Sequence, residues 1–214
     1  MSTDTHTLLL LLNWMSPAFP VGSFAYSHGQ EWAIAEGGLR DGDTVESWIA
    51  ALLRSGSGWN DAVLFARCWH GDAEELNALA LALAGSAERY AETTDLGRNF
   101  AMAAAVWTGA AVPERAIAYP IAAGSACKAM GVGQEQAIAA YLQGFASALV
   151  SVAVRLVPLG QTRGLQALRN LMPVIAETAA RATAATLDDL GSNAIAAEIA
   201  AMKHETLETR IFRT

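Results

Sequence analysis

Residues 43–53 read DTVESWIAALL, and this stretch decides the class of fold. Its apolar side chains recur at intervals of three and four residues, at Val45, Trp48, Ile49, Leu52 and Leu53. That spacing places them along one face of an amphipathic helix. Asp43 and Glu46 have the spacing of a capping box at the start of this helix. Gly56 and Gly58 predict its end.

Helical spacing continues along most of the chain. Further helices are predicted over residues 61–71, 72–83, 86–106, 120–131, 134–157 and 161–170, with a short last helix ending near residue 202. Asp61, Ser86 and the pair Asp72 and Glu75 are residue types that begin helices. Pro120 suits a first helical turn, where its missing N–H group has no partner to lose.

Pro173 either begins a new helix or kinks the preceding one, because a proline inside a helix removes a backbone hydrogen bond. Residues 187–193 predict a polar break before the last helix. Alternating runs of Val, Ile and Thr between turn residues, which would indicate strands, are absent from the sequence. We therefore predict an all-α fold, in which helices of moderate length pack into one compact, bundle-like domain.

The composition is that of an acidic protein with few charges. Hydrophobic residues make up 53% of the chain, charged residues 16%, and the net charge is −7. Because nucleic-acid phosphates require a basic surface, this charge argues against nucleic-acid binding. Cys68 and Cys127 are too few for a disulfide framework. They fit a reducing compartment, so we expect a cytoplasmic location.

Two apolar stretches bear on a membrane role. The leucines at 8–12 lack the basic region and cleavage site of a signal peptide. Residues 136–154 carry no charge and approach the length of a membrane span. Their glutamines, serines and many alanines make a poor span, so a buried central helix is the favoured interpretation. No membrane association is expected, and association through this helix is the weaker alternative.

Motifs for chemistry are scarce. The sequence contains neither the GxxxxGK[ST] pattern of a nucleotide site nor the GxSxG pattern of a serine hydrolase. Ser27, His28 and Glu31 lie close together in a turn-rich segment and are the candidates for catalysis. Turn formation, capping and hydrogen bonding explain these residues better than catalysis does. His28 and Glu31 would share a helical face, but no complete metal-ligand set is present, so no metal or cofactor is expected.

The chain is predicted to divide into a helical domain, residues 1–202, and a C-terminal tail, residues 203–214. Apolar periodicity stops in the tail, which predicts a segment that is mobile until it binds a partner. Residues 210–213, RIFR, place two arginines around an isoleucine and a phenylalanine. Arginines and aromatic residues are typical anchors of protein interfaces. A solvated, frayed end is the alternative interpretation.

The turn-rich segment and the tail together resemble the UreF family of urease accessory proteins. The matching residues are Ser16-Pro17, Pro20-Val21-Gly22, Phe24, Tyr26-Ser27-His28-Gly29, Glu31, Leu156 to Gln161, His204-Glu205 and Arg210 to Arg213. They occur in the order of the family and span nearly the whole chain. Two positions depart from the pattern: Gln30 stands where a leucine is expected, and Thr214 stands where a serine is usual.

The resemblance implies a scaffold without catalytic activity that acts as a homodimer and chaperone in the cytoplasm. It implies a role in inserting nickel into the urease apoprotein. The implied partners are UreD (also called UreH) and the GTPase UreG, with UreE as the protein that delivers nickel. No resident cofactor is implied, because nickel would pass transiently.

The residues expected to bind partners are Tyr26, Ser27, His28, Glu31, His204, Glu205, Arg210, Phe212 and Arg213. The segment from Tyr26 to Glu31 is expected to shape a partner-facing surface or to hold the tail in place. Two alternatives stay open. One is a hydrolase-like enzyme with a helical site around Ser27, His28 and Glu31. The other is a scaffold that supplies an arginine in trans to stimulate GTP hydrolysis by UreG.

Overall fold

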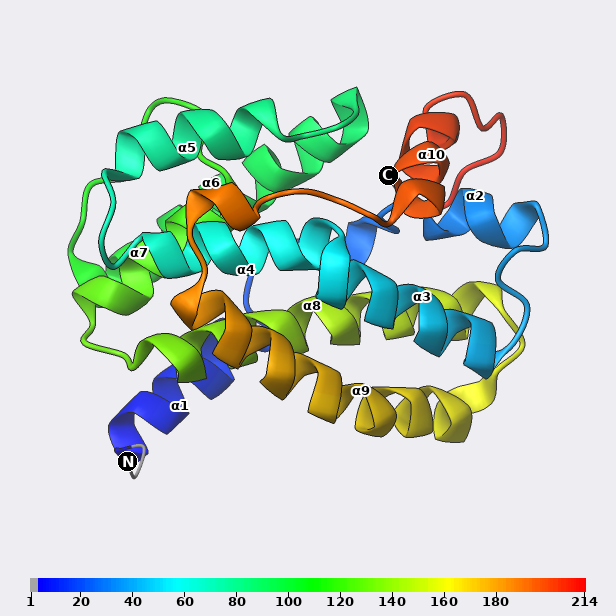
Figure 1. Ribbon diagram of the computed structural model, residues 1–214, viewed down its shortest axis with the longest axis horizontal. Coiled ribbons are helices and arrows are strands. Elements are labelled where there is room, and N and C mark those ends of the chain that lie inside the picture. The colour runs from blue at the N-terminus through cyan, green and yellow to red at the C-terminus, as the bar shows by residue number, and fades with distance from the viewer. Residues whose placement is uncertain (1–3) are drawn as a thin grey trace.

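The computed structural model describes residues 4–214, which form ten α-helices and two short 3₁₀ helices (Figure 1). The α-helices are α1 (Thr5–Trp14), α2 (Gln30–Ala35), α3 (Gly42–Ser55), α4 (Ser57–Arg67), α5 (Ala73–Ala82), α6 (Ala87–Thr108), α7 (Tyr119–Ala129), α8 (Gln134–Leu156), α9 (Gly160–Ala184) and α10 (Ile195–His204). The 3₁₀ helices are η1 (Ser23–Ala25) and η2 (Leu187–Asp189). The described residues contain no strand, so the prediction of an all-α fold is confirmed.

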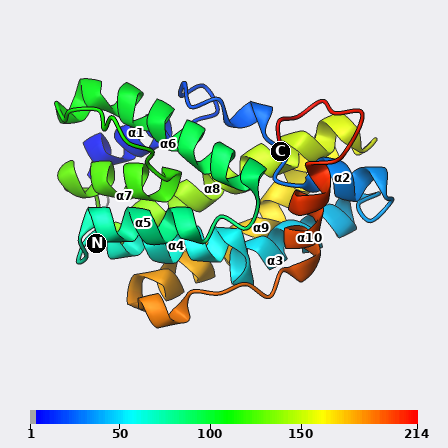
Figure 2. The same ribbon diagram turned by 90° about the horizontal axis from the view of Figure 1, so that it is seen from above.

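Helix α8 runs through the middle of the fold, with α4, α7 and α9 packed against it (Figures 1 and 2). Ile138, Leu142, Ala146 and Leu149 form its inward face and are at most 3% exposed. Within the described chain, α8 is the one helix long and apolar enough to cross a bilayer by length and composition. Half of its most apolar window is buried inside the protein, which agrees with the predicted central helix.

The predicted capping box of α3 is wrong by two residues. Asp41 is the capping residue, with an extended backbone and a carboxylate that accepts a hydrogen bond from the Thr44 N–H at 2.9 Å. The Thr44 hydroxyl in turn accepts from the Asp41 N–H at 3.1 Å. Asp43 lies in the first turn of the helix instead. Two aspartates precede the apolar stripe, and only the first has the extended backbone that a capping residue requires.

The predicted start of the next helix is also wrong. Only Gly56 separates α3 from α4, so Gly58 and Asp61 both lie within α4. Asp61 faces the interior and accepts a hydrogen bond from the Tyr141 hydroxyl at 2.8 Å. Burial raises the pKa of Asp61, outweighing the Arg89 charge and the Tyr141 hydrogen bond, which lower it. Aspartate is typical of helix starts, but here a partner 80 residues away holds it inside a helix.

Other boundaries follow their sequence signals. Asp72 caps α5, and Ser86 caps α6 by accepting from the Arg89 N–H at 3.1 Å. Gly109 ends α6 in the left-handed conformation, with a φ of 64°. Helix α9 continues through Pro173, so no new helix begins there.

The tail does not extend freely from α10. Residues 205–214 fold back, and the end of the chain lies beside α10 and α2 (Figures 1 and 2). Phe212 and Thr214 are 5% and 2% exposed, whereas Arg210, Ile211 and Arg213 face outward. Inward and outward residues therefore alternate at the end of the tail, which explains why helical periodicity stops. The predicted mobility is not what the structure shows, because hydrogen bonds and buried side chains hold the tail in place.

Candidate partner-binding site around the C-terminal tail

The entrance to α2 depends on two consecutive residues in the left-handed conformation. His28 has a φ of 57° and is the one described non-glycine residue with a positive φ. Gly29 follows with a φ of 79°, and a Cβ atom there would lie 2.7 Å from the Ala201 backbone nitrogen. Glycine at this position therefore allows α10 to pack closely on α2. A strained histidine is uncommon and persists only where its surroundings hold it.

Glu31, in the first turn of α2, holds the tail by its backbone. Its carboxylate accepts hydrogen bonds from the N–H groups of Ile211 and Phe212, at 2.7 and 2.9 Å. The same carboxylate lies 3.1 Å from Nε2 of His204. Glu31 is only 7% exposed, so these donors replace the water that a surface carboxylate would bind. The contact fixes two successive peptide groups of the tail.

Ser27 and His28 hold the last residue of the tail. The Ser27 N–H donates to the Thr214 backbone oxygen at 2.8 Å, and the Ser27 hydroxyl donates to the same oxygen. The His28 N–H donates to the Thr214 hydroxyl at 3.2 Å. That hydroxyl donates to Glu92, on α6, at 3.0 Å. Ser27 and His28, in the turn before α2, and Glu92, on one face of α6, together form a socket that holds Thr214.

Tyr26 and Arg213 form a third contact. The Tyr26 hydroxyl donates to the Asp95 carboxylate at 2.7 Å, and the Arg213 guanidinium lies 3.1 Å from that carboxylate and 5.4 Å from the centre of the Tyr26 ring. Burial, followed by the hydrogen bond to Asp95, raises the pKa of Tyr26 well above its usual value. The phenol therefore stays protonated and donates at neutral pH.

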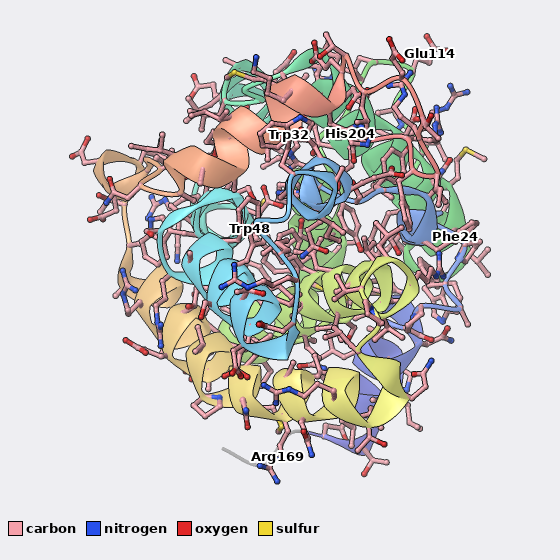
Figure 3. The ribbon with its side chains drawn as sticks, turned by 90° about the vertical axis from the view of Figure 1, so that its right-hand side faces the viewer. Phe24, Trp32, Trp48, Glu114, Arg169 and His204 are labelled. Carbon is pink, nitrogen blue, oxygen red and sulfur yellow. The ribbon has the colours of Figure 1, made fainter. Side chains whose placement is uncertain are left out.

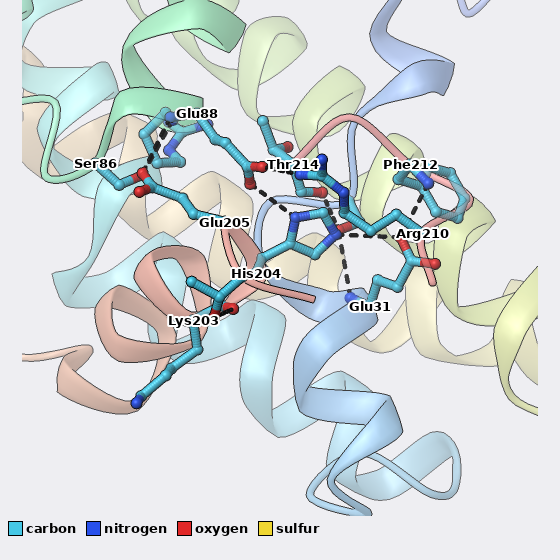
Figure 4. Close-up of polar contacts among 12 residues, drawn as sticks. Glu31, Ser86, Glu88, Lys203, His204, Glu205, Arg210, Phe212 and Thr214 are labelled. Carbon is cyan, nitrogen blue, oxygen red and sulfur yellow. Dashed lines mark hydrogen bonds and ion pairs between the residues drawn. The ribbon is translucent and has the colours of Figure 1, made fainter. Parts of the chain in front are cut away.

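His204 and Glu205 connect the end of α10 to the start of α6 (Figure 4). His204 Nδ1 lies 2.7 Å from a Glu88 oxygen, and the other oxygen of Glu88 accepts from Arg210 at 2.5 Å. Glu205 accepts from the Ala87 N–H at 2.8 Å, at the N-terminus of α6. A carboxylate is favoured there because the first N–H groups of a helix lack partners within the helix.

The structure brings all nine predicted partner-binding residues into one region, but most of them are not free to meet a partner. Figure 3 shows this side of the molecule, with His204 and Phe24 labelled. The buried members are Tyr26, Ser27, His28, Glu31, His204 and Phe212. Three members are exposed: Glu205, Arg210 and Arg213. Two exposed apolar residues of the same segments are not among the nine: Phe24, 65% exposed, and Ile211, 75% exposed.

Sequence reasoning also missed the acidic face of α6 that receives the tail. Glu88, Glu92 and Asp95 are spaced by four and three residues, which places them on one face of the helix. Each contacts a tail residue or His204. The spacing was available in the sequence as a signal. An acidic helical face is usually exposed to water, however, and nothing local in the sequence pairs it with residues more than 100 positions later.

The side chains of Ser27, His28 and Glu31, the residues of the hydrolase alternative, do not hydrogen-bond to one another as those of a catalytic triad would. Glu31 binds the tail, and the Ser27 hydroxyl binds Thr214. His28 instead lies between Ser57 and Glu92, with Nε2 2.5 Å from the Ser57 hydroxyl and Nδ1 3.2 Å from the carboxylate. This is the order of groups in a serine–histidine–carboxylate triad.

The space beside Ser57 argues against a substrate for that arrangement. The adjoining cavity has a volume of about 50 Å³, which suits a few water molecules. Small-molecule sites occupy roughly 300–1,000 Å³. The contacts of His28 are therefore best explained as a buried network that supports the Thr214 socket.

Metal ligands do not gather at this site. Across residues 4–214, no group of three or more His, Cys, Asp or Glu side chains is placed to hold a metal ion. The two carboxylates beside His204 contact opposite nitrogens of its ring, so they cannot share one ion with it. The geometry is that of side chains that bind one another.

Comparison with known proteins identifies the family. The UreF family model matches residues 39–172. The chain is 49% identical over 211 residues to the urease accessory protein UreF of Cereibacter sphaeroides strain ATCC 17025, which covers 98% of this chain and 100% of that protein. It is 47% identical over 219 residues to UreF of Rhizobium leguminosarum bv. trifolii strain WSM2304, with 99% and 98% covered. This chain belongs to the UreF family of urease accessory proteins.

Proposed function

We propose that this chain is a scaffold without catalytic activity that joins a UreD (UreH) protein and the GTPase UreG during nickel insertion into the urease apoprotein. Membership of the UreF family supports a role in urease maturation. The sequence has no P-loop pattern, so GTP in such a complex would be bound by the partner. Nickel would reach this complex from UreE and pass through without being retained on this chain. A cytoplasmic location and a homodimeric state belong to the same proposal.

The observation that carries the proposal is the exposed Ile211 in a fixed backbone. Its side chain is 75% exposed, although its N–H group is bound by Glu31 at 2.7 Å. Arg210 and Arg213, on either side, also face outward. A preordered apolar side chain between two arginines matches the usual composition of interface anchors, and fixing it beforehand lowers the entropy lost on binding.

The predicted contact residues therefore have two different roles in the proposal. Ser27, Glu31, His204 and Phe212 are inward anchors that position the tail. Arg210, Ile211 and Arg213 form the outward face that meets a partner. Both arginines lie within ion-pair distance of carboxylates of α6, which supports a docking role over an arginine supplied to a GTPase active site.

The test is co-expression of the full chain with UreD and UreG, followed by measurement of complex size and of nickel-dependent urease activation. We expect a stable complex that activates apo-urease. Ile211→Ala should reduce complex formation while leaving the thermal unfolding of the isolated chain unchanged. Ile195→Ala is the matched control, because Ile195 is 66% exposed on α10, outside the tail. Normal complexes and normal activation with Ile211→Ala would contradict the proposed binding face.

A further inference from the structure

The imidazole of His204 lies between two carboxylates, and the ring itself is closed to water. The side chain is 0% exposed. Nε2 lies 3.1 Å from Glu31, on α2, and Nδ1 lies 2.7 Å from Glu88, on α6 (Figure 4). His204 therefore links α10, α2 and α6 at the place where the tail begins.

The number of protons on this ring decides whether both contacts are hydrogen bonds. A neutral imidazole has one donor and one acceptor, and an ionised carboxylate only accepts. Both contacts can be donated together only by the imidazolium form, which carries a proton on each nitrogen. In the neutral form, one ring lone pair would face a carboxylate oxygen. That arrangement is costly because the ring is fully buried, so water cannot reach the nitrogen that lacks a donor.

The other charged groups around His204 belong to the tail and its socket. Arg210 binds the second oxygen of Glu88. The N–H groups of Ile211 and Phe212 bind Glu31. The neighbouring side chains of α10, Lys203 and Glu205, are exposed. Loss of the His204 proton would therefore leave the Glu31 and Glu88 carboxylates, whose side chains are 8% and 15% exposed, facing one cation, Arg210. Those same carboxylates hold the tail.

We propose that tail docking in this chain is linked to the protonation of His204. The imidazolium form holds residues 205–214 on the body, and loss of a proton releases them. This inference rests on the proposed function in one respect: the released tail would no longer present the Ile211 face in the fixed position described above. The link between His204 protonation and tail docking is itself a property of the isolated chain.

The experiment measures amide hydrogen exchange of residues 205–214 in the full chain between pH 5.5 and 8.5. Protection factors are compared, because they remove the intrinsic dependence of exchange on pH. This range brackets the ordinary titration of histidine, near pH 6.5. We expect tail protection to fall with rising pH by at least roughly tenfold, the factor for losing one hydrogen bond to a charged group. Constant protection across the range would overturn the proposal.

Two variants assign the effect to His204. His204→Gln cannot titrate, so its tail protection should be independent of pH, whatever its absolute level. His70→Gln is the matched control, because His70 is exposed. His70→Gln should retain the wild-type pH dependence, and retention of that dependence in His204→Gln would overturn the proposal.

A spectroscopic measurement does not depend on how well the variants fold. The ring nitrogen shifts of His204 in the wild-type chain report whether both nitrogens carry protons while the tail is docked. We expect both nitrogens to carry protons whenever the tail is protected from exchange, and a neutral ring with a protected tail would refute the proposal. These measurements use no partner, so their failure is distinct from failure to form a complex with UreD and UreG.

Discussion

The carboxylate of Glu31 accepts a hydrogen bond at 2.9 Å from the backbone of Phe212, 181 residues later in the chain. This contact joins the start of α2 to the end of the protein. It makes the turn before α2 and the C-terminal tail a single structural feature of this chain, in which the turn supports the tail.

Glu31→Gln should loosen the tail without unfolding the helical body. The amide has one accepting oxygen in place of two, and its NH₂ group would face donors. We expect loss of about 1.5–3 kcal/mol of tail docking, the range for a hydrogen bond to a charged group. Amide exchange of residues 205–214 measures this loss. Glu36→Gln, at the exposed end of α2, is the control and should leave exchange unchanged.

Gly29→Ala should be more destabilising than Gly37→Ala. Both glycines have similar positive φ values, 79° and 75°, so both substitutions carry a backbone penalty of roughly 1–2 kcal/mol. A Cβ atom at residue 29 would lie 2.7 Å from Ala201 N, whereas one at residue 37 meets nothing within 4 Å. The difference between the two unfolding free energies, measured by urea denaturation, isolates the close packing of α10 on α2. Equal effects would show that this packing is easily relaxed.

Gln30→Leu should stabilise the fold. Gln30 is 0% exposed, and neither its side-chain oxygen nor its nitrogen has a hydrogen-bond partner. Replacing an unsatisfied buried amide by an apolar side chain of similar size should raise the unfolding free energy by about 1–3 kcal/mol. Gln161→Leu, at an exposed position of α9, should change it by less than roughly 0.5 kcal/mol. A destabilised Gln30→Leu chain would indicate that the amide has a partner in solution.

Acid should destabilise the chain partly through Glu92. Burial favours the neutral form of this carboxyl, but the charges of Arg89 and His28 and the hydrogen bonds from both lower its pKa to about 2. The usual value is 4.5. Because the folded pKa is the lower one, the stabilisation is fully present above pH 4.5 and is lost as the pH falls toward 2. It amounts to about 3 kcal/mol, and Glu92→Gln should flatten the stability profile over this window in denaturant titrations.

Both cysteines should resist thiol reagents in the folded chain. Burial raises the pKa of Cys68 to about 11 and that of Cys127 to about 12, so little reactive thiolate exists at pH 8. Labelling with a chromogenic disulfide should be slow in buffer and should reach two thiols per chain in denaturant. Rapid labelling of the native protein would show that α4 or α7 opens readily.

Local signals were sufficient for most of the helices. The apolar stripe of α3 and the capping residues Asp72 and Ser86 act within a few positions of themselves, and the structure follows them. The errors arose where two local candidates competed or where a distant partner intervened. Asp41 and Asp43 are equivalent by type, and Asp61 lies inside a helix where Tyr141 hydrogen-bonds it.

The candidate site, too, could be predicted from the sequence only in part. Its residues could be selected from the sequence because packing does not require a glutamate at 31 or a histidine at 204. Their partners could not, since Glu88, Glu92 and Asp95 look like an ordinary exposed helical face until the tail is placed on it. The sequence also did not show which tail residues would be buried anchors and which would face outward. An alternation over only four residues does not indicate what either face will contact.

By itself, the sequence determined the all-α class, the approximate helices and the family, since helical periodicity, capping and motif order are written in short stretches of chain. Only the tertiary structure decided that the tail folds back, that Phe212 and Thr214 are buried, and that Ile211 is exposed. Those outcomes depend on contacts between residues more than 100 positions apart, and such contacts form only when the packed helices bring α2, α6 and α10 to the same end of the molecule.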